Sequence, residues 1–325
     1  MKVLVTGASG FIGSILVEKL LESGFDVTAS IRSTSSKEYL RDNRIRFIEL
    51  DYSDIQSLKE VFYIQKFECI LHLAGLTKAR APEDFNRVNY LYTKNLIDSI
   101  KDLNIRLIFL SSFAAHGPGD EKEFLKVRNL DKDNPNTQYG ISKLKAENYI
   151  RDNLKENYLI FRPTGVYGHR EKDYYIYFKT IKNHLEPYLG YQPQRLSFVY
   201  VDDLVELCIK AITSSKSNNT YFVSDGNMYL DTEFAEITKR VLNTWTIKLR
   251  FPLFVVKWIS NFNEFFGKIS GKSFTLNKDK YNILSARNWD CDIEDLKKDL
   301  DYNPKVFLEE GVRKTIEWYK NHGWL

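Results

Sequence analysis

The sequence predicts an α/β fold built on a doubly wound parallel sheet, with a smaller lobe at the C-terminal end of the chain. Two observations predict this class. Short β-rich segments alternate with helical patterns through the first half of the 325-residue chain, as they do in βαβ units. The first of these strands also runs directly into a glycine-rich turn, residues 6–13, that opens a helix, which is typical of a Rossmann-type sheet.

The strands and helices of the first half follow one another in regular order. We expect strands at Lys2–Thr6, Val27–Ile31, Ile45–Leu50, Cys69–Ala74, Ile105–Ser111 and Leu159–Arg162. We expect helices between them at Ile12–Ser23, Asp54–Ile64, Glu83–Leu103 and Thr137–Asn153. Gly24 can end the first helix, and Pro82 can open the third.

The pattern loosens after about Gly168. Helices are expected at Tyr174–His184, Asp202–Ile212, Asp231–Asn243, Pro252–Ile269 and Lys305–Lys320, and short strands at Ser197–Val201 and Tyr221–Val223. Because no linker separates two independent units, we divide the chain into a first domain, residues 1–168, and a smaller lobe, residues 169–325, interwoven with it. Segments such as 197–212 are expected to return to the first domain.

One segment of the smaller lobe, Pro252–Ile269, carries a pronounced apolar stripe. Its members are Phe254, Val255, Trp258, Ile259, Phe262, Phe265 and Phe266. A core or interface helix accounts for such a stripe. Two other interpretations are the wall of an apolar pocket and a contact with a membrane surface.

Composition and charge exclude several classes of protein. The net charge of +4, from 47 basic and 43 acidic residues, is too small to predict a nucleic-acid partner. Cys69, Cys208 and Cys291 form no CxxC pair, and their odd number argues against a disulfide framework, so we expect a reducing, cytoplasmic compartment. No apolar run reaches the roughly 18 residues of a membrane span, and because the sequence opens on a strand-like run we expect no signal peptide.

The turn between the first strand and the first helix has the residues needed to bind a pyrophosphate. Its glycines are spaced G-x-x-G-x-x-G, which permits a tight turn and close approach of the backbone to the phosphates. The helix that follows presents free N–H groups and the positive end of its dipole to the anion. A purely structural βα turn is the alternative. We predict that the cofactor is bound here by Gly7, Ser9, Gly10, Phe11, Ile12 and Gly13.

The residues after the second and third strands bear on the cofactor. A site selective for NAD usually has an acidic residue after the second strand, whereas this chain has Ile31 and Arg32. Because Arg32 could pair with a 2′-phosphate, we expect NADP to be preferred over NAD. Asp51, which follows the third strand, either accepts a hydrogen bond from the adenine amino group or caps the next helix.

Tyr139 and Lys143 lie four residues apart at the start of an expected helix and therefore share one of its faces. A free tyrosine titrates near about 10, so acid–base chemistry at neutral pH needs a lower pKa, and a nearby ammonium group favours the phenolate. Ser111 and Ser112 end the fifth strand at the carboxyl edge of the sheet, where ligands bind in open α/β folds. A serine at this edge can hydrogen-bond a reacting oxygen, or it can simply cap a turn.

These residues belong to a wider set of motifs, and the chain resembles an extended short-chain dehydrogenase/reductase of the NAD-dependent epimerase/dehydratase group over nearly its whole length. His116 stands where the family usually has tyrosine, and Asp301 replaces the glycine of its closing motif. The segments that carry the resemblance are Thr6–Gly13, His72–Gly75, Val88–Asn89, Ser111–Gly117, Tyr139–Lys143, Arg162–Gly168, Phe198–Asp203 and Asp301–Pro304.

The resemblance implies roles for individual residues. Tyr139 would be the general acid/base, Lys143 would lower its pKa and hold the cofactor ribose, and Ser112 aligns with the catalytic hydroxyl. Asn89, His116 and Arg195 would lie on the substrate side, although a helix-surface amide, the replacement of one ring by another and a solvated arginine explain them equally well. Further cofactor contacts are implied at Leu73, Ala74 and Gly75.

The resemblance also implies an activity. We expect an NAD(P)-dependent oxidoreductase that transfers a hydride at a secondary alcohol or ketone carbon of a small-molecule substrate. Arg162–Gly168 and Pro252–Ile269 are similar to the hydroxysteroid dehydrogenase and dihydroflavonol reductase branch. The alternative is a nucleotide-sugar epimerase of the UDP-sugar 4-epimerase type, although Gly165 replaces the asparagine usual before V-Y-G. A catalytically silent nucleotide-binding regulator is the third option.

Two further expectations concern other reactions and assembly. Phe113 and Ala114 follow Ser112 where a dehydratase of the family carries acidic residues, so dehydration is not expected. The histidines show no metal-ligand spacing, so no metal is expected. Relatives often form homodimers by pairing two long helices into a four-helix bundle, and we expect the same of Glu83–Leu103 and Thr137–Asn153.

Overall fold

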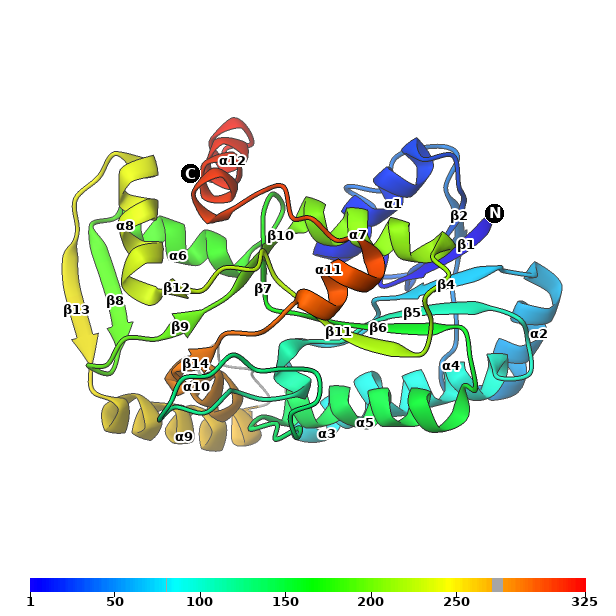
Figure 1. Ribbon diagram of the computed structural model, residues 1–325, viewed down its shortest axis with the longest axis horizontal. Helices are drawn as coiled ribbons and strands as arrows, with labels where there is room; N and C mark the ends of the chain where they lie inside the picture. The colour runs from blue at the N-terminus through cyan, green and yellow to red at the C-terminus, as the bar shows by residue number, and fades with distance from the viewer. Residues whose placement is uncertain (80, 271–276) are drawn as a thin grey trace.

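The centre of the protein is a seven-stranded parallel sheet (Figure 1). The computed structural model describes residues 1–79, 81–270 and 277–325, and for 264–270 it describes the backbone alone. The sheet has the order β11-β6-β5-β4-β1-β2-β3, and every neighbouring pair is parallel, which confirms the predicted doubly wound α/β fold. Its strands are β1 (Lys2–Thr6), β2 (Asp26–Ser30), β3 (Arg46–Ile48), β4 (Cys69–His72), β5 (Arg106–Leu110), β6 (Tyr158–Pro163) and β11 (Asn219–Val223).

Helices cover both faces of this sheet (Figure 1). On one face, α1 (Phe11–Glu22) packs against α7 (Val201–Thr213). On the other face, α2 (Ile55–Gln65), α4 (Tyr92–Ile100) and α5 (Gln138–Asn153) lie side by side. The central strand β5 is buried at all five positions, four of them apolar, because helices cover the sheet on both sides. The pairing of α4 and α5 with a second copy of the chain stays a prediction.

The helix expected at Glu83–Leu103 begins at Pro82 and changes its winding along its length. A short α-helix, α3 (Pro82–Phe85), leads into the π-helical segment η1 (Asn86–Leu91), which continues as α4. Asn89, one of the predicted site residues, lies in the π-helical segment and is buried. Such segments are uncommon and occur frequently at functional sites.

The smaller lobe is held together by aromatic packing. Phe198, for example, packs edge-on against Tyr167 with the ring centroids 5.9 Å apart. Much of the chain's aromatic content is therefore structural. The helices around this cluster are α6 (Asp173–Lys182), α8 (Asp231–Leu242) and α12 (Leu308–Asn321). The aromatic members of the cluster are Tyr167, Phe178, Phe198, Tyr200, Phe234 and Tyr319.

Several short elements outside the main sheet have no counterpart in the sequence prediction. Most of these strands have two or three residues, too few to show an alternating pattern, and the two five-residue strands pair with each other in a separate small sheet. The strands are β7 (Gly165–Tyr167), β8 (Leu185–Leu189), β9 (Arg195–Leu196), β12 (Tyr229–Leu230), β13 (Ile247–Phe251) and β14 (Asn288–Trp289); β10 (Phe198–Tyr200) was expected. The helices are η2 (Phe113–Ala115), α10 (Lys278–Ser285) and α11 (Glu294–Leu300), whereas α9 (Leu253–Ser270) was expected.

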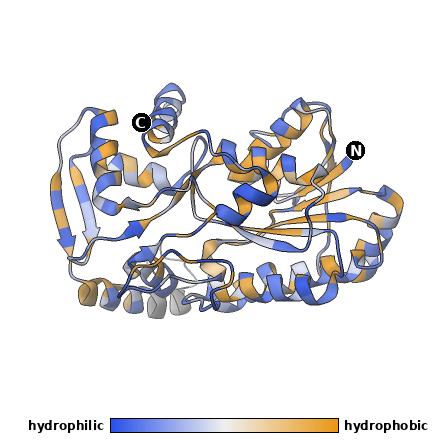
Figure 2. Cartoon of the chain, viewed as in Figure 1, coloured by the Kyte–Doolittle hydropathy of each residue, from blue (hydrophilic) through white to orange (hydrophobic). Residues whose placement is uncertain are grey.

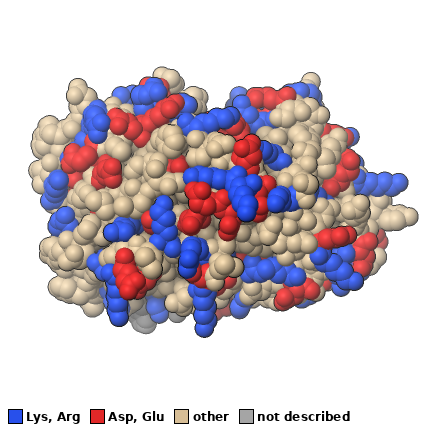
Figure 3. Space-filling model, viewed as in Figure 1, with Lys and Arg blue, Asp and Glu red and all other residues tan. Residues whose placement is uncertain are grey.

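The surface shows no strong preference for one sign of charge. Basic and acidic side chains are interspersed over the face seen in Figure 3, as the small net charge leads one to expect. Within the described ranges, no helix is both long enough and apolar enough to cross a bilayer.

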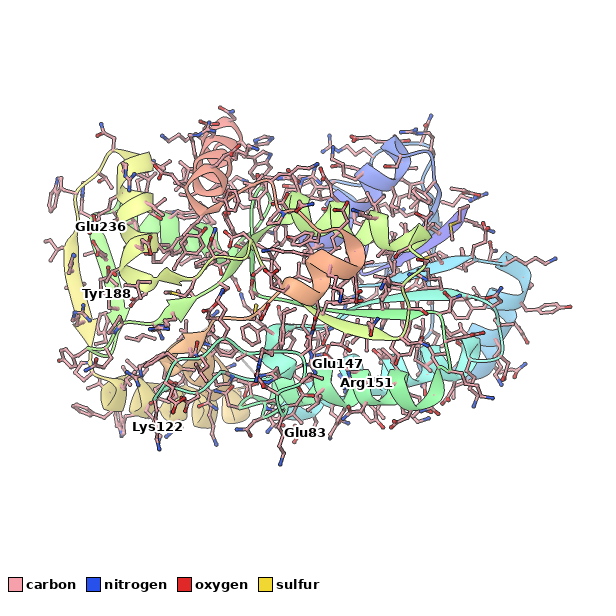
Figure 4. All side chains as sticks on the ribbon, viewed as in Figure 1. Glu83, Lys122, Glu147, Arg151, Tyr188 and Glu236 are labelled. Atoms are coloured by element: carbon pink, nitrogen blue, oxygen red, sulfur yellow. The ribbon has the colours of Figure 1, made fainter. Side chains whose placement is uncertain are left out.

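A buried ion pair fastens α5 to the sheet. The carboxylate of Glu147, fully buried on α5 (Figure 4), accepts hydrogen bonds from Arg162 Nε at 3.0 Å and Nη2 at 2.6 Å, and Arg162 belongs to β6. Arg162 also pairs with Asp133, and Ser111 Oγ donates to Glu147 at 2.5 Å. Burial alone would lower the pKa of Arg162, but Glu147 and Asp133 raise it above its usual value. Arg162 therefore keeps its positive charge inside the protein.

Replacing Glu147 by alanine should lower the free energy of unfolding by about 3–5 kcal/mol, because Arg162 would keep its buried charge with one partner fewer. Urea unfolding followed by circular dichroism measures the change. Glu317→Ala is the control, since it removes only an exposed partner of Arg313 and should cost about 0.5 kcal/mol. Equal losses in the two variants would contradict this account.

Candidate active site

A cleft of about 820 Å³ opens at the carboxyl ends of β1, β2 and β4. Open α/β sheets bind their ligands at this edge. The predicted cofactor residues that line the cleft are Gly7, Ser9, Gly10, Arg32, Asp51, Leu73, Ala74 and Gly75. Phe11, Ile12 and Gly13 do not line it and lie in the first turn of α1. The structure thus brings together eight of the residues that the sequence assigned to the cofactor.

The glycine-rich turn has the close packing that a pyrophosphate cradle requires. Gly7 has a φ of +68°, and a Cβ there would lie 2.8 Å from Ala74 N, so neither the conformation nor the space suits another residue. A Cβ on Gly13 would lie 2.3 Å from the Gly7 carbonyl oxygen, so the helix can approach the turn only at a glycine. Among the described residues, no side chain caps the N-terminus of α1, which leaves its first N–H groups available to an anion.

Thr6 holds the opposite wall of the cleft. Its hydroxyl oxygen accepts hydrogen bonds from the backbone N–H groups of Leu73 and Ala74, both at 3.1 Å. The same hydroxyl lies 2.7 Å from Nδ1 of His72, and burial lowers the pKa of that histidine to about 3. His72 is therefore neutral and serves to orient the segment after β4.

Arg32 and Asp51 stand at the far end of the cleft. Arg32 is exposed, and its side chain has no acidic partner in the described part of the chain. Asp51 accepts hydrogen bonds from the N–H of Ser53 at 2.9 Å and from its hydroxyl, which hold the pKa of Asp51 below its usual value. The helix-cap interpretation of Asp51 is wrong, because Asp54 accepts the hydrogen bonds at the start of α2.

Lys143 connects α5 to the edge of the cleft. Its ammonium group donates to the carbonyl oxygen of Leu110 at 2.8 Å, where β5 ends. A Cβ on Gly75, which lines the cleft, would lie 3.5 Å from this ammonium nitrogen. Burial lowers the pKa of Lys143 to about 8, against the opposing influence of Glu147. The lysine is thus a buried cation, poised to lose its proton at mildly alkaline pH.

Tyr139 and Ser112 lie next to each other at the start of α5. Burial raises the pKa of Tyr139, and a hydrogen bond with Ser112 opposes that rise. The sequence analysis expected Lys143 to lower this pKa, but the lowering influence in the structure comes from Ser112. The Ser112 oxygen also accepts a hydrogen bond from Ala114 N at 3.2 Å and so caps the short helix η2. Ser112 therefore combines a capping contact with a position beside Tyr139.

Asn89 is buried rather than exposed on a helix surface, so that alternative is wrong. Its side-chain oxygen accepts from Leu76 N at 2.7 Å, and its nitrogen donates to Leu76 O and to Ser142 Oγ, each at 3.0 Å. Asn89 therefore braces the segment after β4 against α5.

His116 is buried between the rings of Phe113 and Phe222, with centroid separations of 6.2 and 5.6 Å. Its Nδ1 lies 2.9 Å from the carbonyl oxygen of Gly117. Its Nε2 has no hydrogen-bond partner among the described residues. Packing against these two rings is enough to explain why an aromatic side chain occupies position 116, and no contact with a ligand is needed to explain it.

Arg195 stands beside a second arginine that the sequence analysis missed. The guanidinium groups of Arg195 and Arg287 lie 4.8 and 5.0 Å from the centroid of one ring, that of Phe124. Arg195 is half-buried and donates to Phe124 O at 3.0 Å, so it is not simply a solvated arginine. The strands β9 and β14 pair Arg195 with Asn288, the residue after Arg287, which explains the proximity of the two cations.

Asp279 is a second residue that no sequence signal indicated. Its two carboxylate oxygens accept from Gln138 N at 3.1 Å and from Tyr139 N at 3.0 Å, the first N–H groups of α5. Thr137 caps the same helix by accepting from Gly140 N at 2.9 Å. Because Asp279 belongs to α10, the smaller lobe completes the cap of the helix that carries Tyr139.

The lowered pKa of Lys143 makes a prediction about stability. Between pH 8 and 10.5 the unfolded chain holds a proton on this lysine that the folded chain has released, so the free energy of unfolding should rise with pH. Relative to Lys143→Met, the wild type should gain up to about 3 kcal/mol across this range. Urea unfolding of both proteins at neutral pH and at about pH 9.5 measures the difference, and a pH-independent difference would contradict the prediction.

Comparisons with known proteins agree with this geometry. Residues 3–224 match the model of the NAD dependent epimerase/dehydratase family. A UDP-glucose 4-epimerase of Vibrio cholerae is 27% identical over 330 residues, which cover 97% of this chain and 94% of that protein. Protein CapI of Staphylococcus aureus is 24% identical, with 98% of each chain covered.

Solved structures share the fold. The crystal structure of a UDP-glucose 4-epimerase with UDP-glucose from Thermotoga maritima superposes with a TM-score of 0.80 at 22% identity, over 99% of each chain. A UDP-glucuronic acid 4-epimerase from Bacillus cereus in complex with NAD gives a TM-score of 0.78 at 20% identity, again over 99% of each chain. The family model matches more than half of this chain. The chain therefore belongs to the NAD-dependent epimerase/dehydratase family, which is a family of enzymes.

Proposed function

We propose that this enzyme transfers a hydride between a nicotinamide dinucleotide and a secondary alcohol carbon of its substrate, with Tyr139 as the acid/base. The observation that supports the proposal is the arrangement of side chains at the start of α5. Tyr139, its neighbour Ser112 and the ammonium group of Lys143 lie there, and Lys143 reaches Gly75 at the rim of the 820 Å³ cleft.

The cleft suits a dinucleotide. Gly7 and Gly13 let the turn pack closely against the segment after β4 and against the start of α1, and the uncapped start of α1 suits the pyrophosphate. Arg32 and Asp51 line the end of the cleft where the adenosine half would lie. Once bound, the nicotinamide accepts or returns the hydride.

Residues of the chain itself carry out the proton transfer. As the alcohol carbon gives up its hydride, the phenolate oxygen of deprotonated Tyr139 takes the proton from the alcohol oxygen and becomes a hydroxyl, and a C=O bond forms. The Ser112 hydroxyl donates a hydrogen bond to the same oxygen. The hydrogen bond with Ser112 favours the phenolate of Tyr139, and Lys143 would hold the ribose of the cofactor. The reverse sequence reduces the carbonyl.

We further propose a nucleoside-diphosphate sugar as the substrate class. The guanidinium groups of Arg195 and Arg287 face the ring of Phe124. Arg287 is paired with Glu121 at 3.1 Å, whereas Arg195 has no ion pair among the described residues and suits a phosphate of a diphosphate. Their strands lie next to α10, which contacts the start of α5 through Asp279. The named relatives that act on UDP-sugars support the same class.

Two net reactions are compatible with this chemistry. A dehydrogenase or reductase releases its product after one hydride transfer. The glycine at position 165 favours this reaction, because it replaces the asparagine that binds the diphosphate in epimerases. An epimerase returns the hydride to the same carbon, which the similarity to UDP-sugar epimerases favours. A dehydratase is disfavoured because Phe113 and Ala114 follow Ser112.

Tyr139→Phe should lower kcat by about 10²–10⁴-fold with little change in KM, because it removes the proton-transferring oxygen. The assay follows a panel of nucleoside-diphosphate sugars by chromatography and the reduced cofactor by absorbance. Tyr149→Phe is the control, since that tyrosine lies on the same helix and its hydroxyl contacts Asp98. Unchanged turnover of Tyr139→Phe would overturn the proposal; isomerisation without a change in absorbance would identify an epimerase.

We propose that Arg32 favours NADP over NAD. Arg32→Ala should weaken NADP binding by at least about tenfold and leave NAD binding nearly unchanged, because a charge-assisted bond to the 2′-phosphate is lost. Fluorescence titration with the two reduced cofactors measures the affinities. Arg41→Ala, an exposed arginine that does not line the cleft, is the control. Tighter binding of NAD than of NADP by the wild type would refute this preference.

A further inference from the structure

The helix α9 carries its large apolar side chains on the side that faces solvent. Phe254 and Trp258, four residues apart, are 75% and 68% exposed. The inward positions Val256 and Ser260 are almost fully buried, and the Ser260 hydroxyl donates to Lys257 O at 2.8 Å. A helix that packs on a protein core shows the opposite arrangement, with its polar residues outward.

The exposed side chains form one surface, which we call the α9 apolar face. Apolar residues mark the first turns of α9 along the lower edge of the molecule (Figure 2). Trp258 stacks on the ring of Phe262 with centroids 5.7 Å apart. Exposed apolar surfaces of this kind indicate a site of interaction. The members of the α9 apolar face are Phe251, Phe254, Trp258, Ile259 and Phe262.

This finding excludes one interpretation of the apolar stripe. A core helix would bury Phe254 and Trp258, and the structure exposes both. Phe265 and Phe266, which the sequence analysis placed in the same stripe, have side chains outside the described part of the structure.

Basic residues outnumber acidic ones along this segment. Residues 247–264 contain Lys248, Arg250 and Lys257, and their one acidic residue is Glu264. Lys257 is exposed beside Trp258 and has no acidic partner among residues 1–79, 81–263 and 277–325. Lys248 reaches Glu236, and Arg250 lies over the ring of Tyr188. The complementary surface should therefore be apolar and negatively charged.

A lipid surface fits these properties better than a second copy of the chain does. A symmetric pair of copies would bring Lys257 and its basic neighbours towards the same residues of the partner. Trp and Phe on one face of a helix, with lysine and arginine beside them, are typical of helices that lie in the interface of an anionic bilayer. The absence of a membrane-crossing helix in the described ranges agrees with surface contact rather than insertion across the membrane.

We propose that the α9 apolar face docks this enzyme onto the surface of a bilayer that contains anionic lipid. The face lies on the smaller lobe, at the opposite end of the molecule from β1, β2 and α1 (Figure 1). The part of the cofactor cleft at β1 and β2 therefore lies away from the docked surface. This proposal does not depend on the reaction that the enzyme catalyses.

Sedimentation of the full-length protein with vesicles tests the proposal. We expect binding to vesicles of phosphatidylcholine with phosphatidylglycerol, and weaker binding to phosphatidylcholine alone or in high salt. The double variant Phe254→Ser, Trp258→Ser should lower partitioning at least about tenfold. Lys257→Glu should lower it at least about fivefold, because it reverses a charge at the lipid surface.

Control variants separate docking from general hydrophobicity. Tyr63→Ser and Leu130→Ser remove apolar side chains that are 75% and 97% exposed elsewhere on the surface, and their partitioning should match the wild type. Circular dichroism melting verifies that each variant is folded. Failure of the wild type to bind anionic vesicles, or equal losses in the controls, would overturn the proposal. A second result would also overturn it: no vesicle binding, together with light scattering that shows a dimer of the wild type and a monomer of the double variant. The α9 apolar face would then join two copies of the chain.

Discussion

The contact of Glu147 with Arg162 is the interaction on which the arrangement of the site depends. It joins the middle of α5 to β6, and Ser111 ties the same carboxylate to the end of β5. Lys143 lies one turn before Glu147, and Ser112 directly follows Ser111. One buried carboxylate thus contacts Ser111, the immediate neighbour of Ser112, and lies one helical turn from Lys143. A buried ion pair contributes little net stability, and its value here lies in fixing one register between helix and sheet.

The parts of the fold that the sequence predicted are those encoded locally. The alternation of strands and helices defines the parallel sheet, and the turn Thr6–Gly13 identifies the first βα unit before any contact is known. Tyr139 and Lys143 could likewise be selected because four residues of helix place them on one face. The π-helical winding at Asn86–Leu91 leaves no comparable trace, because its hydrogen-bond pattern depends on packing rather than on a period in the sequence.

The parts that were missed depend on contacts between distant residues. Asp279 meets Tyr139 across about 140 positions of the chain, and Arg287 meets Phe124 across more than 160. Neither pairing has a spacing that could be read in advance. The protonation of Tyr139 is a related case. The residue was identified from its neighbour four positions away, but its pKa depends first on burial, which only the folded structure determines.

The position of Asp279 has a consequence for how this protein can change. In the first turn of the helix that bears Tyr139, two backbone N–H groups donate hydrogen bonds to Asp279, a residue of the other lobe. A substrate lobe exchanged between relatives would have to supply a carboxylate at this point, or the recipient helix would begin with unsatisfied donors. The lobe therefore cannot diversify as a free module: its surface loops can vary, whereas the start of α10 must vary in concert with the start of α5.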